Sequence, residues 1–212
     1  MASRLKQFIE SVAGEKAPGP STTFSVAHIF YALEFVAEKP IGRTKLSEKL
    51  NVGDGAIRTI INHLKDAGLI ETSKVGCTLT AKGVSVWKKI KAFFPKRGEI
   101  ERTELTNAEH NYAFLVKNSG HKVKSGIEQR DAAIVAGAKR AVIIVSKGGH
   151  LSIESVSDDI AKDFPEATNQ IIKVIRPEDN DAIIIAGANV LQKAKNAAFA
   201  ASWVLINGDK KK

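Results

Sequence analysis

Apolar residues recur at helical spacing along residues 24–68. The first stripe, in residues 24–38, ends before Pro40, and a shorter one in residues 44–50 begins at Thr44, a candidate N-cap. The clearest stripe falls at positions i, i+3, i+4 and i+7 and consists of Ile57, Ile60, Ile61 and Leu64. The pattern predicts three helices, of which the third is apolar along one face and polar along the other.

Capping residues bound this third helix, and a hairpin is expected after it. Asp54 can cap its N-terminus, and Gly68 stands where a left-handed C-terminal cap is expected. The segments LIETSK and CTLT flank Val75-Gly76, which predicts two short strands joined by a tight turn. A further helix from Thr80 is expected to bury Val84, Trp87, Ile90 and Phe94.

Helix, short helix, turn, helix, hairpin and helix follow one another in a winged helix-turn-helix domain. The stretch LSEKLNVGDGAIRTIINHLKDAGLIE, followed by LTAKG, resembles the DNA-binding half of prokaryotic winged-helix transcription regulators. The resemblance covers residues 24–95 and implies that this half of the chain binds DNA. The wing is short, with a single lysine, Lys74, near its tip.

The positive charge of the chain is concentrated in this half. Residues 1–100 hold 16 basic and 9 acidic side chains, a net +7, whereas residues 101–212 hold 16 and 14, a net +2. This asymmetry indicates that the first half meets a polyanion. The third helix would enter the major groove and read bases with its outward residues Ala56, Arg58, Thr59, Asn62, His63 and Lys65. Phosphate contacts are expected from Arg43, Lys45, Lys49, Lys65 and Lys74.

Three of these side chains have the donors or apolar groups that base reading needs. Arg58 can pair with guanine through its forked donors, Asn62 can pair with adenine, and Thr59 can offer a methyl or a hydroxyl group to thymine. Each residue alone is better explained as part of the solvated face that every amphipathic helix has. The net charge, the capped helix and the following hairpin together favour DNA binding.

The second half alternates strand-like and helix-like segments. The runs YAFLVKN, RAVIIVS, HLSIES and DAIIIAG predict strands. GIEQRDAAIVAGA, residues 158–175 and the C-terminal ANVLQKAKNAAFAASWVLI predict helices. The order indicates an α/β sandwich with a ferredoxin-like sequence of elements and with helices on one face of the sheet. The fold class is therefore α+β, with a winged helix-turn-helix domain in residues 1–97 and an α/β domain for effector sensing or dimerisation in residues 98–212.

The helix that starts near Gly126 is expected to place a charged residue, Arg130 or Asp131, on or beside its apolar face. An internal polar network is one explanation. The other is a ligand pocket, in which Lys124, Ser125 and the Gly126 amide bind an anion at the helix N-terminus. The ligand would then be fixed by Glu128, Gln129, Arg130 and Asp131. Both explanations stay open at this point.

The stretches SGIEQRDAAIVAGAKRAVIIV, KGGHLSI and DAIIIAG, with the AAFAASWVL helix, resemble the C-terminal domain of a family of archaeal winged-helix proteins. The resemblance covers nearly the whole chain and implies an archaeal, cytoplasmic transcription regulator, but it supplies no catalytic residue. The leading hypothesis is a transcription regulator that binds double-stranded DNA as a homodimer, because one recognition helix reads too few base pairs alone. Its C-terminal domain would sense a small anionic effector, hold the dimer together, or do both. Candidate dimer surfaces are residues 2–12, the helix at 80–94 and the C-terminal helix.

Other functions find weaker support in the sequence. An enzyme in the second half could use Glu128 and Asp131 as acid and base, but no nucleophile elbow, Walker loop or GxGxxG accompanies them. An RNA-binding or protein-binding winged helix is a third class, although no aromatic stacking platform is evident. The histidines lack metal-ligand spacing, so neither a metal nor another cofactor is expected. The single cysteine, Cys77, cannot form an internal disulfide, which fits a reducing cytoplasm.

Overall fold

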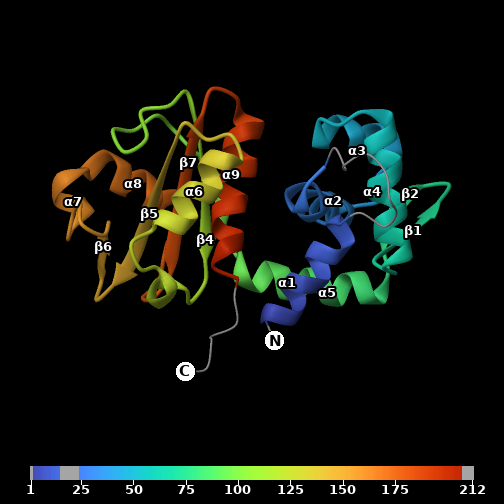
Figure 1. Cartoon of the computed structure of the whole chain (residues 1–212), viewed down its shortest axis with the longest axis horizontal. Coiled ribbons are helices and arrows are strands. Elements are labelled where there is room, and N and C mark those ends of the chain that lie inside the picture. Colours follow the sequence, from blue (N-terminus) through green and yellow to red (C-terminus); the bar gives the residue numbers. More distant parts are fainter. Residues whose placement is uncertain (1, 15–23, 207–212) are drawn as a thin grey trace. The chain divides into compact units, whose positions relative to one another are not determined.

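A computed structural model describes residues 2–14 and 24–206 of the chain. It divides into two compact units, of which the first ends at Lys91 and the second runs from Ala92 to Ile206 (Figure 1). The predicted boundary at 97/98 lies slightly later. The earlier boundary arises because Phe94 packs with the second unit, with its ring 5.6 Å from that of Phe114 and 6.0 Å from that of Phe199.

The first unit has the expected winged-helix order. Its elements are α1 (Ala2–Ala13), α2 (Val26–Glu38), α3 (Arg43–Leu50), α4 (Asp54–Asp66), β1 (Ile70–Ser73), β2 (Gly76–Leu79) and α5 (Ala81–Phe93). The strands β1 and β2 pair antiparallel as the wing. The predicted N-caps of α3 and α4 were wrong. Both helices start slightly earlier, and their N-caps are Gly42 and Gly53, not Thr44 and Asp54.

The apolar face of α4 is buried as predicted. Ile57, Ile60 and Leu64 are fully buried, and Ile61 is nearly so. Because the helices of this unit bury their stripes against one another, α4 can turn its polar face outward. On α5 the prediction was wrong in part: Gly83, Val86 and Ile90 face inward, whereas Val84 is 40% exposed.

Hydrogen bonds around Thr80 hold the start of α5 against the segment that follows α4. The Thr80 hydroxyl donates to the carbonyl of Gly68 at 2.6 Å, and the Gly83 amide donates to the same hydroxyl oxygen at 3.0 Å. Gly68 has φ +69°, the left-handed conformation expected of it. Gly83 approaches Leu69 so closely that a Cβ there would lie 2.0 Å from the Leu69 carbonyl oxygen. These contacts fix the wing and α5 relative to the end of α4.

The second unit is a five-stranded antiparallel sheet with helices. Its elements are β3 (Arg97–Ile100), β4 (His110–Val116), a 3-10 turn η1 (Gly120–Lys122), α6 (Ile127–Val135), β5 (Arg140–Lys147), β6 (His150–Ser152), α7 (Ile160–Asp163), α8 (Pro165–Val174), β7 (Ala182–Ala188) and α9 (Leu191–Val204). The strand order is β3-β4-β7-β5-β6, and every neighbouring pair is antiparallel. The α+β fold class is thus confirmed.

The ferredoxin-like expectation holds for the sequence of elements but not for the order of strands. From β4 onward the elements follow the expected strand-helix-strand-strand-helix-strand sequence, with two successive helices, α7 and α8, in the second crossover. In a ferredoxin-like sheet the third of these strands lies between the first two, whereas here the fourth, β7, lies between β4 and β5. The physical reason lies in the residues: all seven residues of β7 are buried, while β6 is a three-residue edge strand. The most apolar strand therefore takes the centre of the sheet.

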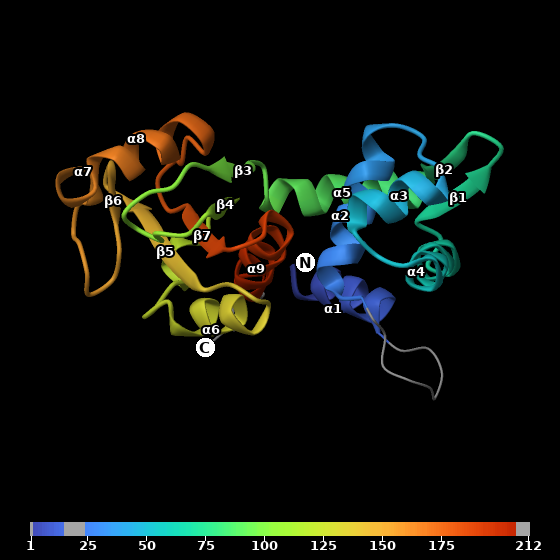
Figure 2. The same cartoon turned by 90° about the horizontal axis from the view of Figure 1, so that it is seen from above.

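Helices cover both faces of the sheet, not one as predicted (Figure 2). Helices α7 and α8 close a core formed with one face, to which Ile160, Ile171 and Ile175 contribute together with Ile144 and Ile183 of the strands. Helices α6 and α9 pack on the other face. The predicted dimer surface on α9 is largely used up by this packing, since Ala197, Phe199 and Trp203 are buried.

Candidate nucleic-acid interface and ligand cavities

The outward face of α4 carries a polar stripe with a positive charge at each end. Arg58, Asn62 and Lys65 are exposed and follow one another at spacings of four and three residues, so they lie along one side of the helix. Ala56 and Thr59 are half-buried, and the Thr59 hydroxyl donates to the Gly55 carbonyl at 3.1 Å. The predicted base-reading residues therefore share the outward side of α4, with the exception of His63.

His63 faces the interior, so its assignment to the DNA-binding face was wrong. Only 7% of the residue is exposed, and its ring packs edge-on against Phe24 at 5.5 Å. Its Nδ1 lies 2.8 Å from the carbonyl oxygen of Val12 in α1. The sequence interpretation treated His63 as a polar surface residue, but the buried face of α4 includes it beside Leu64.

Asp54 joins the two helices of the helix-turn-helix. Its Oδ2 lies 2.7 Å from Nη2 of Arg58 one turn along α4, and its Oδ1 lies 3.5 Å from Nε of Arg43 at the start of α3. All three side chains are about half exposed or more. The sequence interpretation assigned Asp54 only a capping role, although the spacing of four residues between Asp54 and Arg58 is the signal for such a pair.

The N-termini of α3 and α4 are open to an approaching backbone. A Cβ added at Gly42, Gly53 or Gly55 would have no atom of the described chain within 4 Å. Free N–H groups at helix N-termini favour phosphate, and glycine allows close approach to them. The first turn of α3, which has no acidic residue, can therefore receive a sugar-phosphate backbone, whereas the first turn of α4 carries the carboxylate of Asp54.

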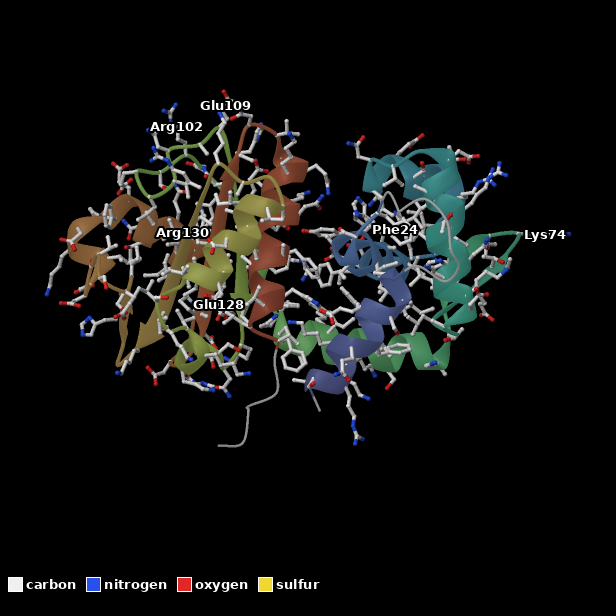
Figure 3. All side chains as sticks on the ribbon, viewed as in Figure 1. Phe24, Lys74, Arg102, Glu109, Glu128 and Arg130 are labelled. Carbon is white, nitrogen blue, oxygen red and sulfur yellow. The ribbon has the colours of Figure 1, made fainter. Side chains whose placement is uncertain are left out.

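The remaining predicted phosphate contacts lie on exposed parts of the same unit. Lys45 and Lys49 project from α3, where Lys49 Nζ lies 4.4 Å from the centre of the Phe35 ring. Lys74 stands at the tip of the β1–β2 hairpin (Figure 3).

The cysteine of the wing, Cys77 in β2, is buried. Burial raises the pKa of its thiol, which disfavours the reactive thiolate.

In the second unit, the charged residues of α6 do not lie on its apolar face as predicted. Arg130 and Asp131 are exposed, and the helix instead buries Gln129 and Ala133. Ile127 and Ile134, expected in the core, are 50% and 46% exposed. The prediction failed because the weak periodicity of this helix was assigned to the wrong side.

Two adjoining cavities lie beside α6 and β5, and they share Val123 and Glu154. The first, of about 280 Å³, is lined by Ser125, Gly126 and Arg130 together with Leu105, Val142 and Phe164. The second, of about 680 Å³, includes Lys124 and is otherwise ringed by polar groups such as Lys147, His150 and Asp179. Four of the seven predicted ligand residues therefore reach a cavity. Glu128, Gln129 and Asp131 line neither of the two.

Gly126 has φ +70° at the N-cap of α6, a conformation that glycine adopts without strain. A Cβ on it would lie 3.4 Å from the side chain of Ile143. The lining of the first cavity also includes two carboxylates, Glu104 and Glu154, besides the guanidinium of Arg130. It therefore suits a ligand that carries both an anionic group and hydrogen-bond donors.

Residues 2–14 and 24–206 contain no group of three or more His, Cys, Asp or Glu side chains arranged to hold a metal ion. Within the same ranges, no helix combines the length and the apolar character needed to cross a membrane.

Comparisons with known proteins agree with this two-part organisation. Residues 28–85 match the family described as the PH0730-like N-terminal domain, and residues 107–205 match a domain of unknown function, DUF4443. Among solved structures, a hypothetical protein, PH0730 from Pyrococcus horikoshii OT3, is similar with a TM-score of 0.69 and 29% identity over 86% of this chain and 92% of its own. A MarR family protein, Rv2887 from Mycobacterium tuberculosis in complex with DNA, gives a TM-score of 0.29 and 21% identity over 42% of this chain and 65% of its own. A search of curated proteins finds no match.

Proposed function

We propose that this protein is a sequence-specific, DNA-binding transcription regulator that acts as a homodimer. The observation that supports this most is the exposed stripe of Arg58, Asn62 and Lys65 on α4, beside an open helix N-terminus. Arginine offers the two parallel donors that guanine O6 and N7 accept, and asparagine offers the donor and the acceptor that adenine N7 and N6 require. Lysines on α3 and at the hairpin tip supply phosphate contacts on the same unit.

The test is binding of the purified protein to duplex DNA and to duplex and single-stranded RNA of matching sequence at several salt concentrations. Duplex DNA is expected to bind most tightly, and log K should fall linearly with log salt, with a slope of about −0.9 for each phosphate contacted. Equal or tighter binding of RNA, or no salt-dependent binding of any nucleic acid, would contradict the proposal.

Dimerisation follows from the size of the module, because two half-sites are needed to reach useful specificity. The apolar side of α1 is buried within the first unit at Ile9 and Val12, so this predicted dimer surface is not free. On α6, by contrast, Ile127, Ile134 and Val135 are exposed, Val135 by 89%. We assign the dimer contact to this outer face of α6. Sedimentation of the wild type as a dimer and of Ile134→Lys as a monomer is expected, and a wild-type monomer on DNA would contradict it.

We further propose that the first cavity binds a small effector with an anionic group, held by Arg130 and by the amide groups at the start of α6. The support is its content of Ser125, Gly126 and Arg130 beside apolar Leu105 and Phe164. Thermal-shift screening of small carboxylates and phosphate esters tests it: a stabilising compound should lose its effect on Arg130→Ala but keep it on Lys173→Ala, which changes an exposed lysine of α8. The proposal includes that the protein acts by binding DNA and effector and not as an enzyme. It also includes the archaeal source that the sequence resemblance implies.

A further inference from the structure

We infer that Asp54 determines sequence specificity by positioning Arg58 for its base contact. This inference rests on the proposed DNA-binding function. Asp54 is the acidic residue of the first turn of α4, the part of a recognition helix that enters the groove first. A carboxylate at that place repels every phosphate that approaches, and capping does not explain it, because the N-cap of α4 is Gly53.

The contacts of Asp54 point to a positioning role. Its Oδ2 is 2.7 Å from Arg58 Nη2, while its Oδ1 is 3.5 Å from Arg43 Nε, so one carboxylate holds two guanidinium groups from two helices. The side chains of Asp54 and Arg58 are 61% and 59% exposed. An ion pair so exposed contributes little to stability, and its main effect is on where the guanidinium lies.

The geometry leaves Arg58 able to read a base. A guanidinium has five N–H donors, and the bond to Asp54 uses one of them. The others remain available for the O6 and N7 acceptors of guanine, which a forked side chain contacts as a pair. A long side chain that is already held near its bound conformation loses less conformational freedom on binding, so the correct base gains affinity.

The same carboxylate disfavours wrong sequences. Where no guanine is present, Arg58 makes no base contact that offsets the repulsion between the Asp54 carboxylate and the DNA backbone, so binding is weaker. Asp54 therefore acts in two directions, helping Arg58 on the correct site and penalising binding elsewhere. Removing its charge should lower the affinity for the correct site and leave or raise the affinity for other DNA.

The experiment compares full-length wild type, Asp54→Asn, Arg58→Ala and the double variant on two duplexes. One is the duplex enriched by the wild-type protein from a random-sequence library, and the other is a scrambled duplex of the same composition. The matched control is Glu48→Gln, which removes one negative charge from the exposed surface of α3. The quantity measured is the specificity ratio, which is the dissociation constant for the scrambled duplex divided by that for the enriched duplex. Thermal melting verifies that each variant is folded.

Asp54→Asn is expected to reduce the ratio about five- to tenfold, with scrambled DNA bound as tightly as by the wild type or more so. Glu48→Gln should tighten both duplexes alike and leave the ratio unchanged. In the Arg58→Ala background, Asp54→Asn should change the ratio less than about twofold, because its effect passes through Arg58.

Three results would overturn the inference: a ratio for Asp54→Asn within about twofold of the wild type, an equal change for Glu48→Gln, or a full effect in the absence of Arg58. An unchanged ratio with both duplexes bound more weakly by the same factor is a case of the first result, and it indicates a structural role only. If the wild type binds no duplex DNA, the library yields no enriched duplex. That result contradicts the proposed DNA-binding function itself, and this inference is then overturned with it.

Discussion

His63 Nδ1 lies 2.8 Å from the carbonyl oxygen of Val12 and ties α4 to α1 across 51 residues of sequence. A carbonyl only accepts, so Nδ1 carries the proton and donates. Because the ring is buried against Phe24, the hydrogen bond replaces water that the imidazole has lost. The histidine therefore supports the helix that carries the candidate interface without touching the nucleic acid.

Replacing His63 by Ala should lower the free energy of unfolding by about 1–3 kcal/mol, through the lost bond and the unpaired carbonyl. Asn62→Ala, one residue away and exposed, is the matched control and should change it by less than about 0.5 kcal/mol. Urea titration measures both. Similar losses for the two variants would mean that His63 is not the buried support described here.

Arg58→Ala should weaken binding to the enriched duplex by about 1–3 kcal/mol and relax its preference at one position. Lys74→Ala should instead weaken binding to all sequences alike and reduce the salt slope by about one. Fluorescence anisotropy on the enriched and scrambled duplexes distinguishes the two effects. Unchanged binding by Arg58→Ala would remove this residue from the interface.

The start of α2 makes stability depend on pH through His28. The Ser25 amide donates to His28 Nδ1 at 3.0 Å, which requires a neutral ring, and burial lowers the pKa of His28 below its ordinary value of 6.5. The unfolded chain therefore takes up a proton more readily than the folded one as the pH falls below 6.5. Stability should be full above that pH and decline as the pH falls from 6.5 toward the pKa of the folded state.

Denaturant unfolding of wild type and His28→Gln between pH 7.5 and about 5 tests this, and the variant should have the shallower dependence on pH. His121→Gln, which alters an exposed histidine of the second unit, is the control. A wild-type dependence no steeper than that of His28→Gln would show that His28 contributes nothing.

Gly83→Ala should strongly destabilise the first unit, because its Cβ would lie 2.0 Å from the Leu69 carbonyl oxygen. The overlap is with backbone, so α5 must move away from the end of α4, at a cost of about 3 kcal/mol or more. Gly55→Ala, in the first turn of α4 with open space around it, should be neutral or stabilise by up to about 1 kcal/mol. Thermal melting of the two variants decides whether the close approach exists.

The winged-helix half could be predicted well because its elements are local. The four-residue stripe of α4, the left-handed Gly68 and the tight hairpin turn each depend on nearby residues, although the turn lies at Lys74-Val75, one residue earlier than predicted. The role of Thr80 could not be predicted, since its hydroxyl contacts the carbonyl of Gly68 across the hairpin. The inward turn of His63 depends on Phe24 and Val12, which are distant in sequence.

In the second half, strand identity was predictable but strand order was not. Apolar runs identify β5 and β7, whereas the placement of β7 between β4 and β5 is a property of the whole sheet. The face of α6 was misassigned because Ile127 and Ile134 are apolar but exposed, while Gln129 is polar and buried. Of the candidate ligand residues, Lys124, Ser125, Gly126 and Arg130 reach a cavity, whereas Glu128, Gln129 and Asp131 of the same segment do not, because which side of α6 meets the cavities is set by its packing on the sheet.

Selection of duplexes from a random-sequence library by the purified full-length protein tests the central claim most directly. The account predicts enrichment of a palindromic sequence whose half-sites lie about 10–10.5 base pairs apart, or a multiple of that, with a guanine in each half whose enrichment is lost with Arg58→Ala. A library that emerges without an enriched sequence, although the protein is folded, would contradict sequence-specific DNA binding by this chain.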